Sequence, residues 1–207
     1  MLPSRRELLI AGTSVTFVGC LSGPSGETET STPDRTPEPE PIADQFDCGE
    51  ADRPEPDIEA GVEHEVERED GSTYVLESIG SAEYPDPPES LDEEHVETFL
   101  REHEAAYLRN NRAETWEEGL IEFSTFFNEI RFLDRWERIE VVVLQVDTDE
   151  KMFHPWQGVE SMVVGHTPQT VAYAVDETGL VRLGRIPYED REDPPSVLEE
   201  GDLVACF

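Results

Sequence analysis

Lysine is almost absent from this chain of 207 residues. Its 15 basic residues include a single lysine, Lys151, and they face 49 aspartates and glutamates, so the formal net charge is −34. Because nothing in the chain resembles a basic stripe, the sequence argues against nucleic acid as a partner. An acidic protein with so little lysine is typical of adaptation to molar salt. At 1 M salt the screening length falls to about 3 Å, so repulsion between like charges becomes tolerable.

The acidity belongs to the part of the chain that is expected to fold. Residues 44–207 hold 43 of the 49 acidic residues and 12 of the 15 basic ones. We interpret this excess as the solvated surface of a salt-adapted domain. A basic partner or a cation-binding face are the functional alternatives.

Long apolar runs are also missing. No stretch reaches the 18 or so apolar residues of a membrane-spanning helix. The run at residues 8–19 is twelve residues long, follows Arg5 and Arg6, and leads to Cys20. A short, mildly apolar run after a positive pair is typical of an export signal.

This opening segment resembles a twin-arginine (Tat) lipoprotein signal. Arg5 and Arg6, followed by Leu8-Leu9, match the Tat pattern, and residues 17–20, "FVGC", are similar to a lipobox. Gly19 agrees with that box, whereas Phe17 and Val18 depart from its usual residues. The resemblance implies that residues 1–19 are removed and that Cys20 carries a lipid. The protein would then be anchored on the extracellular face of the cell membrane without spanning it. The alternative is a Tat signal cut elsewhere, with Cys20 incidental.

The stretch after the signal has the composition of a linker. Residues 21–43 are rich in Pro, Ser, Thr, Gly and Glu and contain no aromatic residue. Such a composition cannot bury enough apolar surface to order itself. We therefore predict a lipidated cysteine and a disordered linker over residues 20–43, and one acidic domain over residues 44–207.

Only three cysteines are present. If Cys20 carries a lipid, Cys48 and Cys206 remain, one at each end of the domain, and disulfides persist outside the cell. A Cys48–Cys206 bridge would close a loop of about 160 residues, worth up to about 5 kcal/mol in the chain-entropy model. The alternative is a pair of free thiols.

One helix is predicted clearly. Residues 91–111 carry a single apolar stripe, and Ser90 with Glu93 forms a capping box in front of it. The stripe consists of Val96, Phe99, Leu100, His103 and Tyr107. Glu102 and Glu104, on either side of His103, are expected to point elsewhere on the helix.

The rest of the domain is predicted as strands. Residues 74–81 alternate as a strand does, and residues 116–133 fit a helix or a strand, with their aromatic and β-branched content favouring the strand. Asp176 and Gly179 flank a short hairpin connection in which the glycine could adopt a positive φ. Further strands are expected at 138–146, 159–166, 170–175 and 180–186. A helix followed by a meander predicts an α+β fold whose antiparallel sheet has one covered face.

That order resembles the cystatin/NTF2-like group, in which one main helix packs on a curved antiparallel sheet. It also resembles haloarchaeal Tat-exported surface lipoproteins, in the acidic Thr/Pro-rich linker, the cysteine near the domain start, the helix ending "AAYLRNN" and the late strand "TVAYAVDETGLVRL". This archaeal likeness implies an extracellular, salt-adapted protein.

Motifs for catalysis or for a cofactor are lacking. His95 and His103 are eight residues apart, whereas a zinc pair on a helix needs a spacing of four, and no phosphate loop or nucleophile elbow occurs. We expect no metal, no cofactor and no catalytic residue. The function predicted is a non-catalytic binding or scaffolding domain. The alternative is a small-ligand carrier or enzyme with an NTF2-like pocket lined by His103, Tyr107, Trp116, His166 and Tyr173.

Overall fold

The computed structural model describes residues 39–207, except 69, 134–135, 157–158, 188–189 and 191–195. Arg5, Arg6, Cys20 and the linker up to residue 38 lie outside the described residues, so the signal and the anchor stay predictions. The described part is an α+β fold with one main helix, a five-stranded antiparallel sheet and a separate two-stranded sheet.

The main helix, α2, spans Glu93–Trp116 and is longer than predicted at its C-terminal end. Its N-cap is Asp92, whose Oδ1 accepts a hydrogen bond from the backbone N–H of His95 at 3.1 Å. The predicted capping box of Ser90 and Glu93 is therefore wrong. A carboxylate at the residue directly before the helix reaches the free amide of the first turn and also favours the positive end of the helix dipole.

Three long strands form most of the sheet: β3 (Leu120–Leu133), β4 (Glu140–Trp156) and β5 (Val159–Asp176). The ambiguous stretch at 116–133 thus divides, because Trp116 ends α2 and a 3₁₀ turn, η2 (Glu117–Gly119), leads into β3. The strand interpretation is confirmed for residues 120–133. A β-bulge shifts the β3–β4 register between Phe127 and Glu129.

Pro168 lies inside β5, opposite Asp147 of β4, and does not break the strand as the sequence suggested. The carbonyl of Thr170 accepts a hydrogen bond from Ile186 N–H at 2.9 Å, on the side away from β4. Backbone groups two residues apart point to the same side of a strand, so the nitrogen of Pro168 also faces away from β4. The proline therefore costs no hydrogen bond of the β4–β5 ladder.

Two short strands complete the sheet, β6 (Gly179–Leu183) and β7 (Asp202–Cys206), in the order β3-β4-β5-β6-β7. The predicted hairpin is confirmed, with Asp176 opposite Gly179. The φ of Gly179 is not positive, although the predicted hairpin allowed a positive value. Glycine is needed there because the backbone lies close to Ile42, and a Cβ at position 179 would lie 2.8 Å from Cγ2 of Ile42.

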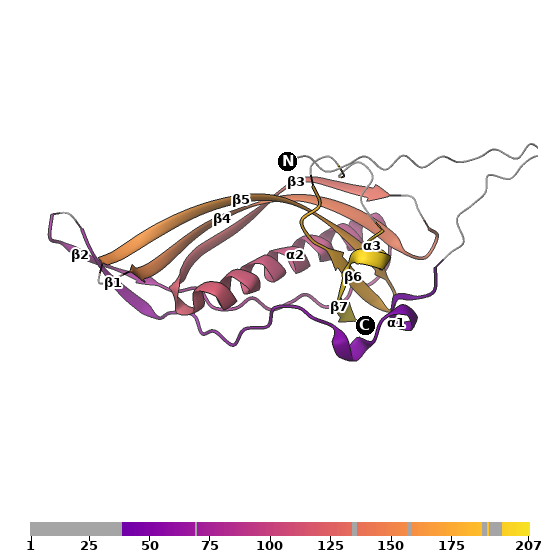
Figure 1. The fold of residues 1–207 in the computed structure, drawn as a ribbon, viewed down its shortest axis with the longest axis horizontal. Coiled ribbons are helices and arrows are strands. Elements are labelled where there is room, and N and C mark those ends of the chain that lie inside the picture. The colour runs from indigo at the N-terminus through magenta and orange to yellow at the C-terminus, as the bar shows by residue number, and fades with distance from the viewer. Residues whose placement is uncertain (1–38, 69, 134–135, 157–158, 188–189, 191–195) are drawn as a thin grey trace, which may run out of the picture. The chain divides into compact units, whose positions relative to one another are not determined.

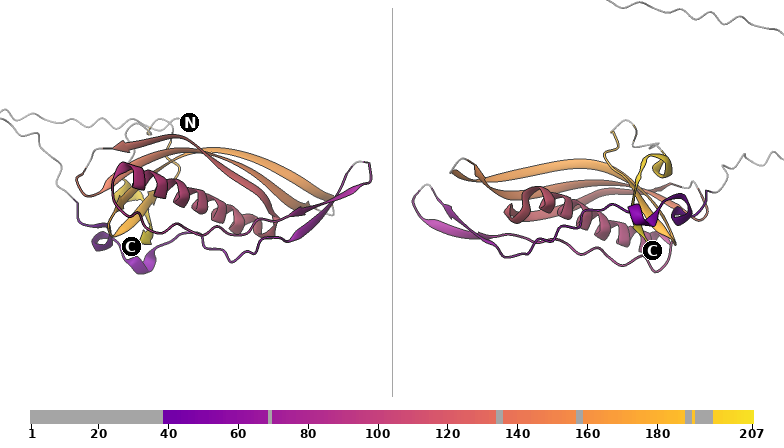
Figure 2. Two further views of the ribbon diagram at one scale, coloured as in Figure 1. Left: turned by 180° about the vertical axis from the view of Figure 1, so that it is seen from behind. Right: turned by 60° about the horizontal axis from the view of Figure 1, so that its bottom comes forward.

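Helix α2 packs along the concave side of the curved sheet (Figure 1; Figure 2, left). The core on this side joins Phe99 and Leu100 of the helix to Leu144 and Tyr173 of the sheet. The opposite face is covered too, near β5–β7, by α1 (Ile42–Gln45) and α3 (Val197–Glu200). The prediction of a single covered face is therefore wrong at this end. Val141, Val143, Ala172 and Ala174 show why, because they form a second apolar face alternating with the first.

The folded part begins before residue 44. Ile42 is fully buried, its N–H donates to Asp176 Oδ2 at 2.8 Å, and Ala43 N–H donates to Thr178 Oγ1 at 3.0 Å. Residues 42–43, which the composition assigned to the linker, thus belong to the folded body.

The disulfide between Cys48 and Cys206 is confirmed, with a Cα–Cα distance of 5.7 Å. Cys48 begins a 3₁₀ turn, η1 (Cys48–Glu50), and Cys206 ends β7, so the bridge ties the start of the domain to the last strand.

The two-stranded sheet consists of β1 (Glu63–Glu67) and β2 (Thr73–Glu77). The strand predicted at 74–81 is shorter than expected, and β1 was not predicted. Val66 of β1 packs with Ile121 of β3 and Phe153 of β4, which holds this hairpin to the large sheet.

Candidate functional site

The five residues predicted to line one pocket lie in three separate places. His103, Tyr107 and Tyr173 meet between α2 and the sheet. Trp116, at the end of α2, packs instead in the cluster of Leu120 and Met152. His166 is exposed on β5, where its Nδ1 lies 2.7 Å from Asp149 Oδ1. The predicted grouping is therefore wrong for Trp116 and His166.

A carboxylate that the sequence interpretation set aside lies at the centre of the first place. Glu104 is fully buried and pairs with Arg182 of β6 through two hydrogen bonds, 2.9 Å from Nε to Oε2 and 2.8 Å from Nη2 to Oε1. The hydroxyl of Tyr173 donates to Glu104 Oε2 at 2.6 Å. The guanidinium of Arg182 also lies over the ring of Tyr107, 4.0 Å from its centroid. This Glu104–Arg182–Tyr173 network lies between the helix and the sheet.

Burial and charge shift the pKa values in this network. Burial, together with the adjacent Glu104 charge, raises the pKa of Tyr173 well above its usual value. Burial alone would lower the pKa of Arg182, but the charge of Glu104 and its hydrogen bonds to the guanidinium outweigh burial and raise the pKa. Arg182 is therefore a permanent cation and Tyr173 a permanent hydrogen-bond donor, so neither is suited to exchange protons near neutral pH.

His103 is neutral in the folded protein. Burial, followed by the charges of Arg53 and Arg182, lowers its pKa to about 3. Its Nδ1 lies 3.4 Å from the Tyr173 hydroxyl, and its buried Nε2 has no hydrogen-bond partner among the described residues. Because the folded pKa is below the unfolded value, the neutral ring contributes stability above about pH 6.5, which is lost progressively as the pH falls toward 3.

The sequence held a signal for this network that the helical interpretation missed. Glu104 is four residues after Leu100 and therefore lies on the same stripe. Arg182 is two residues after Leu180, on the same face of β6. One acid and one base on two facing apolar surfaces predict a buried pair. The expectation that Glu104 points elsewhere is wrong.

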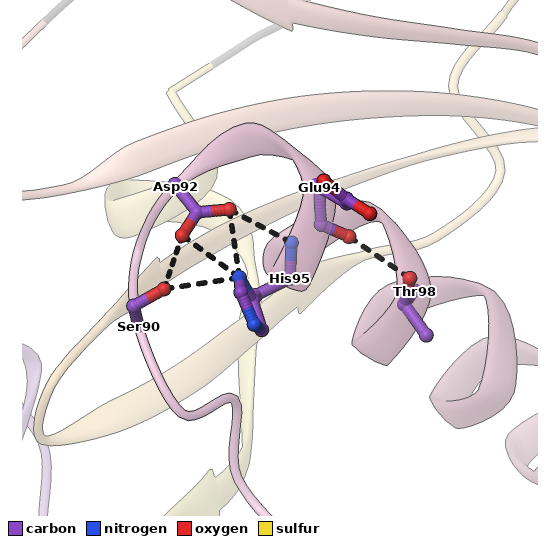
Figure 3. A network of polar contacts seen from close by, with 5 residues as sticks. All are labelled: Ser90, Asp92, Glu94, His95 and Thr98. Atoms are coloured by element: carbon purple, nitrogen blue, oxygen red, sulfur yellow. Dashed lines mark hydrogen bonds and ion pairs between the residues drawn. The ribbon is translucent and has the colours of Figure 1, made fainter.

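A second polar cluster has the residue types of a catalytic triad but not its geometry (Figure 3). Ser90 Oγ lies 3.1 Å from Nδ1 of His95, and both carboxylate oxygens of Asp92 lie 2.8 Å from that same nitrogen. A triad needs the acid on one ring nitrogen and the nucleophile on the other. The side chains are exposed and cap α2. Their hydrogen bonds lower the pKa of Asp92 and raise that of His95.

Within the described residues, no three His, Cys, Asp or Glu side chains come together as metal ligands do. The helices of the same part of the chain include none with the length and hydropathy for crossing a membrane.

A cavity of about 330 Å³ lies between α2 and β5 and is here named the α2–β5 cavity. Leu108, Asn111 and Arg112 of the helix line one side of it, and Phe123, Thr148 and Thr167–Thr170 of the sheet line another. Arg185 and Ile186, just after β6, complete the lining. Volumes of about 300–1,000 Å³ are usual for small-molecule sites. The cavity lies where β6 has ended, because β6 pairs with β5 only from Ala172 to Asp176.

The charged group on the helix side is held in place. Arg112 Nε lies 2.8 Å from Oε2 of Glu150, a side chain that is 6% exposed, and Arg112 Nη2 is 3.5 Å from Thr167 Oγ1. Glu150 lies across Gly165, where a Cβ would come within 2.5 Å of Glu150 Oε1. The missing side chain at Gly165 thus makes room for the carboxylate that orients Arg112.

No protein-family model, curated protein or solved structure matches the chain. The site is therefore interpreted from its own geometry.

Proposed function

We propose that this chain is a lipid-anchored, salt-adapted extracellular protein, attached to the cell membrane through Cys20, and that its domain binds a ligand without transforming it. The domain is in this proposal of the cystatin/NTF2-like kind. The α+β layering, with one main helix on a curved antiparallel sheet, supports that likeness.

A binding role without catalysis is supported by one observation: the buried titratable groups do not line the open cavity. Glu104 and Tyr173 are fully buried and His103 is 1% exposed, so a substrate has no access to these acid–base candidates. The α2–β5 cavity, in contrast, is lined by arginine, threonine and amide side chains together with Leu108 and Ile186. Such groups bind and orient a ligand, whereas none of them has an ordinary pKa near neutrality.

The anchoring role is supported by the resemblance of residues 4–20 to a Tat lipoprotein signal and by the disulfide. Cys48 and Cys206 pair with each other. Since disulfides persist in oxidising compartments, the bridge fits an extracellular domain. It also leaves Cys20 as the one cysteine for a lipid.

Mass spectrometry of the mature N-terminus tests the anchor. We expect a lipid-modified Cys20 as the first residue, with the protein in the membrane fraction at molar salt. Cys20→Ser should move the folded protein to the soluble extracellular fraction. An unmodified Cys20, or cleavage at another bond, would refute the anchor without bearing on the cavity.

The alternative is a small-ligand carrier or enzyme with a pocket between helix and sheet. Like the proposal above, it requires that the domain binds a ligand. The cavity supports the carrier form, although its lining differs from the five residues predicted. An enzymatic form would need a titratable group that a ligand can reach. Turnover of a bound ligand that stops on substitution of a cavity residue would favour the enzyme.

A further inference from the structure

The described residues that line the α2–β5 cavity include two arginines and no acidic residue. The chain has 15 basic residues and a net charge of −34, yet two of those residues, Arg112 and Arg185, line this one cavity. Arg112 is matched by Glu150. Arg185 is exposed and forms no ion pair within the described part of the chain. Among the described residues, the lining of the cavity therefore has one cation without a paired carboxylate.

The backbone of Arg185 is strained in a way that keeps it at the cavity. Its φ is 57°, one of two positive values at non-glycine residues in the described chain. Left-handed backbone is unfavourable for arginine and persists where the surroundings hold it. Here the next residue, Ile186, is buried and donates its N–H to Thr170 O at 2.9 Å. Such strain tends to gather at ligand sites.

The remaining lining is mixed, so it is suited to a ligand that has an apolar body beside its polar group. Leu108 and Ile186 are buried side chains of the lining, and Phe123 adds an aromatic ring. Thr148 and Thr167 add hydroxyl groups on the floor. A volume of about 330 Å³ admits a molecule of small size only.

We propose that the α2–β5 cavity binds a small monocarboxylate with a short apolar body, with the carboxylate paired to the Arg185 guanidinium. This inference rests on the binding function proposed above and names its ligand class. Arginine suits the role because its planar donors match both oxygens of a carboxylate. The charge of Arg112 is already balanced by Glu150, so the described lining has no second unmatched cation for a second negative charge of the ligand.

Calorimetric titration of the full chain at molar KCl tests the proposal, with phenylacetate as the probe and phenylacetamide as its neutral counterpart. We expect phenylacetate to bind with a Kd on the order of 1 mM or tighter. Phenylacetamide should bind about tenfold more weakly or worse, since it lacks the charge-assisted hydrogen bonds.

Arg185→Gly is the informative variant, because glycine removes the guanidinium and also relieves the positive φ, so folding is not at risk. It should weaken phenylacetate at least about tenfold, leave phenylacetamide unchanged and not lower the Tm. Arg68→Gln is the matched control, since Arg68 lies over Tyr74 in the β1–β2 hairpin, outside the lining of the cavity. It should bind phenylacetate as the unaltered chain does.

Equal binding of phenylacetate and phenylacetamide, no binding of phenylacetate, or full binding by Arg185→Gly would each overturn the inference. A lipidated, membrane-bound chain that ignores phenylacetate would reject this ligand class while leaving the anchor intact. An unlipidated chain that binds phenylacetate through Arg185 would do the reverse.

Discussion

Replacing Glu104 with glutamine tests whether the Glu104–Arg182–Tyr173 network stabilises the fold. The change keeps the size of the side chain and leaves an oxygen that can still accept from the Tyr173 hydroxyl. It removes the charge opposite Arg182, whose side chain is only 10% exposed. Arg182 cannot escape by losing its proton, because arginine stays protonated throughout the accessible pH range.

The magnitude follows from burial. Unit charges about 4 Å apart interact by about 4 kcal/mol at an effective dielectric of 20. Removal of one partner from buried pairs in proteins typically costs about 3–5 kcal/mol, most of it the penalty for the unmatched charge that remains. We therefore expect Glu104→Gln to lower the free energy of unfolding by about 3–4 kcal/mol, a large part of the 5–15 kcal/mol that a domain usually has.

The matched control lies on the same helix. Glu97 and Arg101 form a pair with a 2.8 Å contact, but both side chains are 40% exposed. Glu97→Gln should change the free energy of unfolding by less than about 0.5 kcal/mol. Urea denaturation at a fixed molar KCl concentration measures both variants, since urea leaves the ionic strength unchanged.

A Glu104→Gln loss no greater than that of Glu97→Gln would refute the reasoning. The double variant Glu104→Gln with Arg182→Met supplies a second check. It removes the unmatched charge, so its loss should be smaller than the sum of the two single losses by at least about 1 kcal/mol. Simple additivity would mean that the two side chains do not act as a pair.

Three further outcomes are expected. Because the pKa of His103 in the folded protein is about 3, this residue should lower the free energy of unfolding by about 1.4 kcal/mol for each pH unit below pH 6.5. Urea titrations at pH 6.5 and 4.5 should show this loss in the unaltered chain and not in His103→Gln. A chain that begins at residue 44 should be less stable in urea than one that begins at residue 39 by about 2–5 kcal/mol, since it lacks the buried Ile42; equal stability would contradict this. Replacing both Cys48 and Cys206 with serine should cost up to about 5 kcal/mol, and the same loss should follow from adding a reductant to the unaltered chain.

The local patterns were sufficient for the main elements. The stripe from Val96 to Tyr107 predicted α2, and the β-branched runs predicted β4–β6. Such patterns can be recognised within one segment, because apolar side chains recur about every 3.6 residues in a helix and every 2 residues in a strand. The cysteine pairing was also predictable, since a count of three with one reserved for lipid leaves two. The five-residue strands β1 and β7 escaped because they are short and depend on partners distant in sequence.

The site was less predictable, for reasons of geometry. Which of several helix residues meet Tyr173 depends on the twist of the sheet and on how far β6 extends, and no local pattern encodes either. Trp116 and His166 were pocket candidates only through the resemblance to NTF2-like folds. Trp116 packs instead with Leu120 and Met152, and His166 is exposed. Arg185 became a candidate through its place in the lining of the α2–β5 cavity and its φ of 57°, and no local sequence pattern encodes either property.

The charge pattern of the molecule now has a physical consequence for recognition. In the molar salt to which we propose that the protein is adapted, the screening length is about 3 Å, so the acidic surface neither attracts nor repels a charged ligand at a distance. Charge can then discriminate among ligands only at contact and in places partly removed from solvent, where screening is weaker. Glu104 with Arg182 uses such a place for stability. We propose that the α2–β5 cavity, with Arg185 at its lining, is the corresponding place for a ligand, because a strongly acidic protein can keep a selective cationic site there without altering its surface.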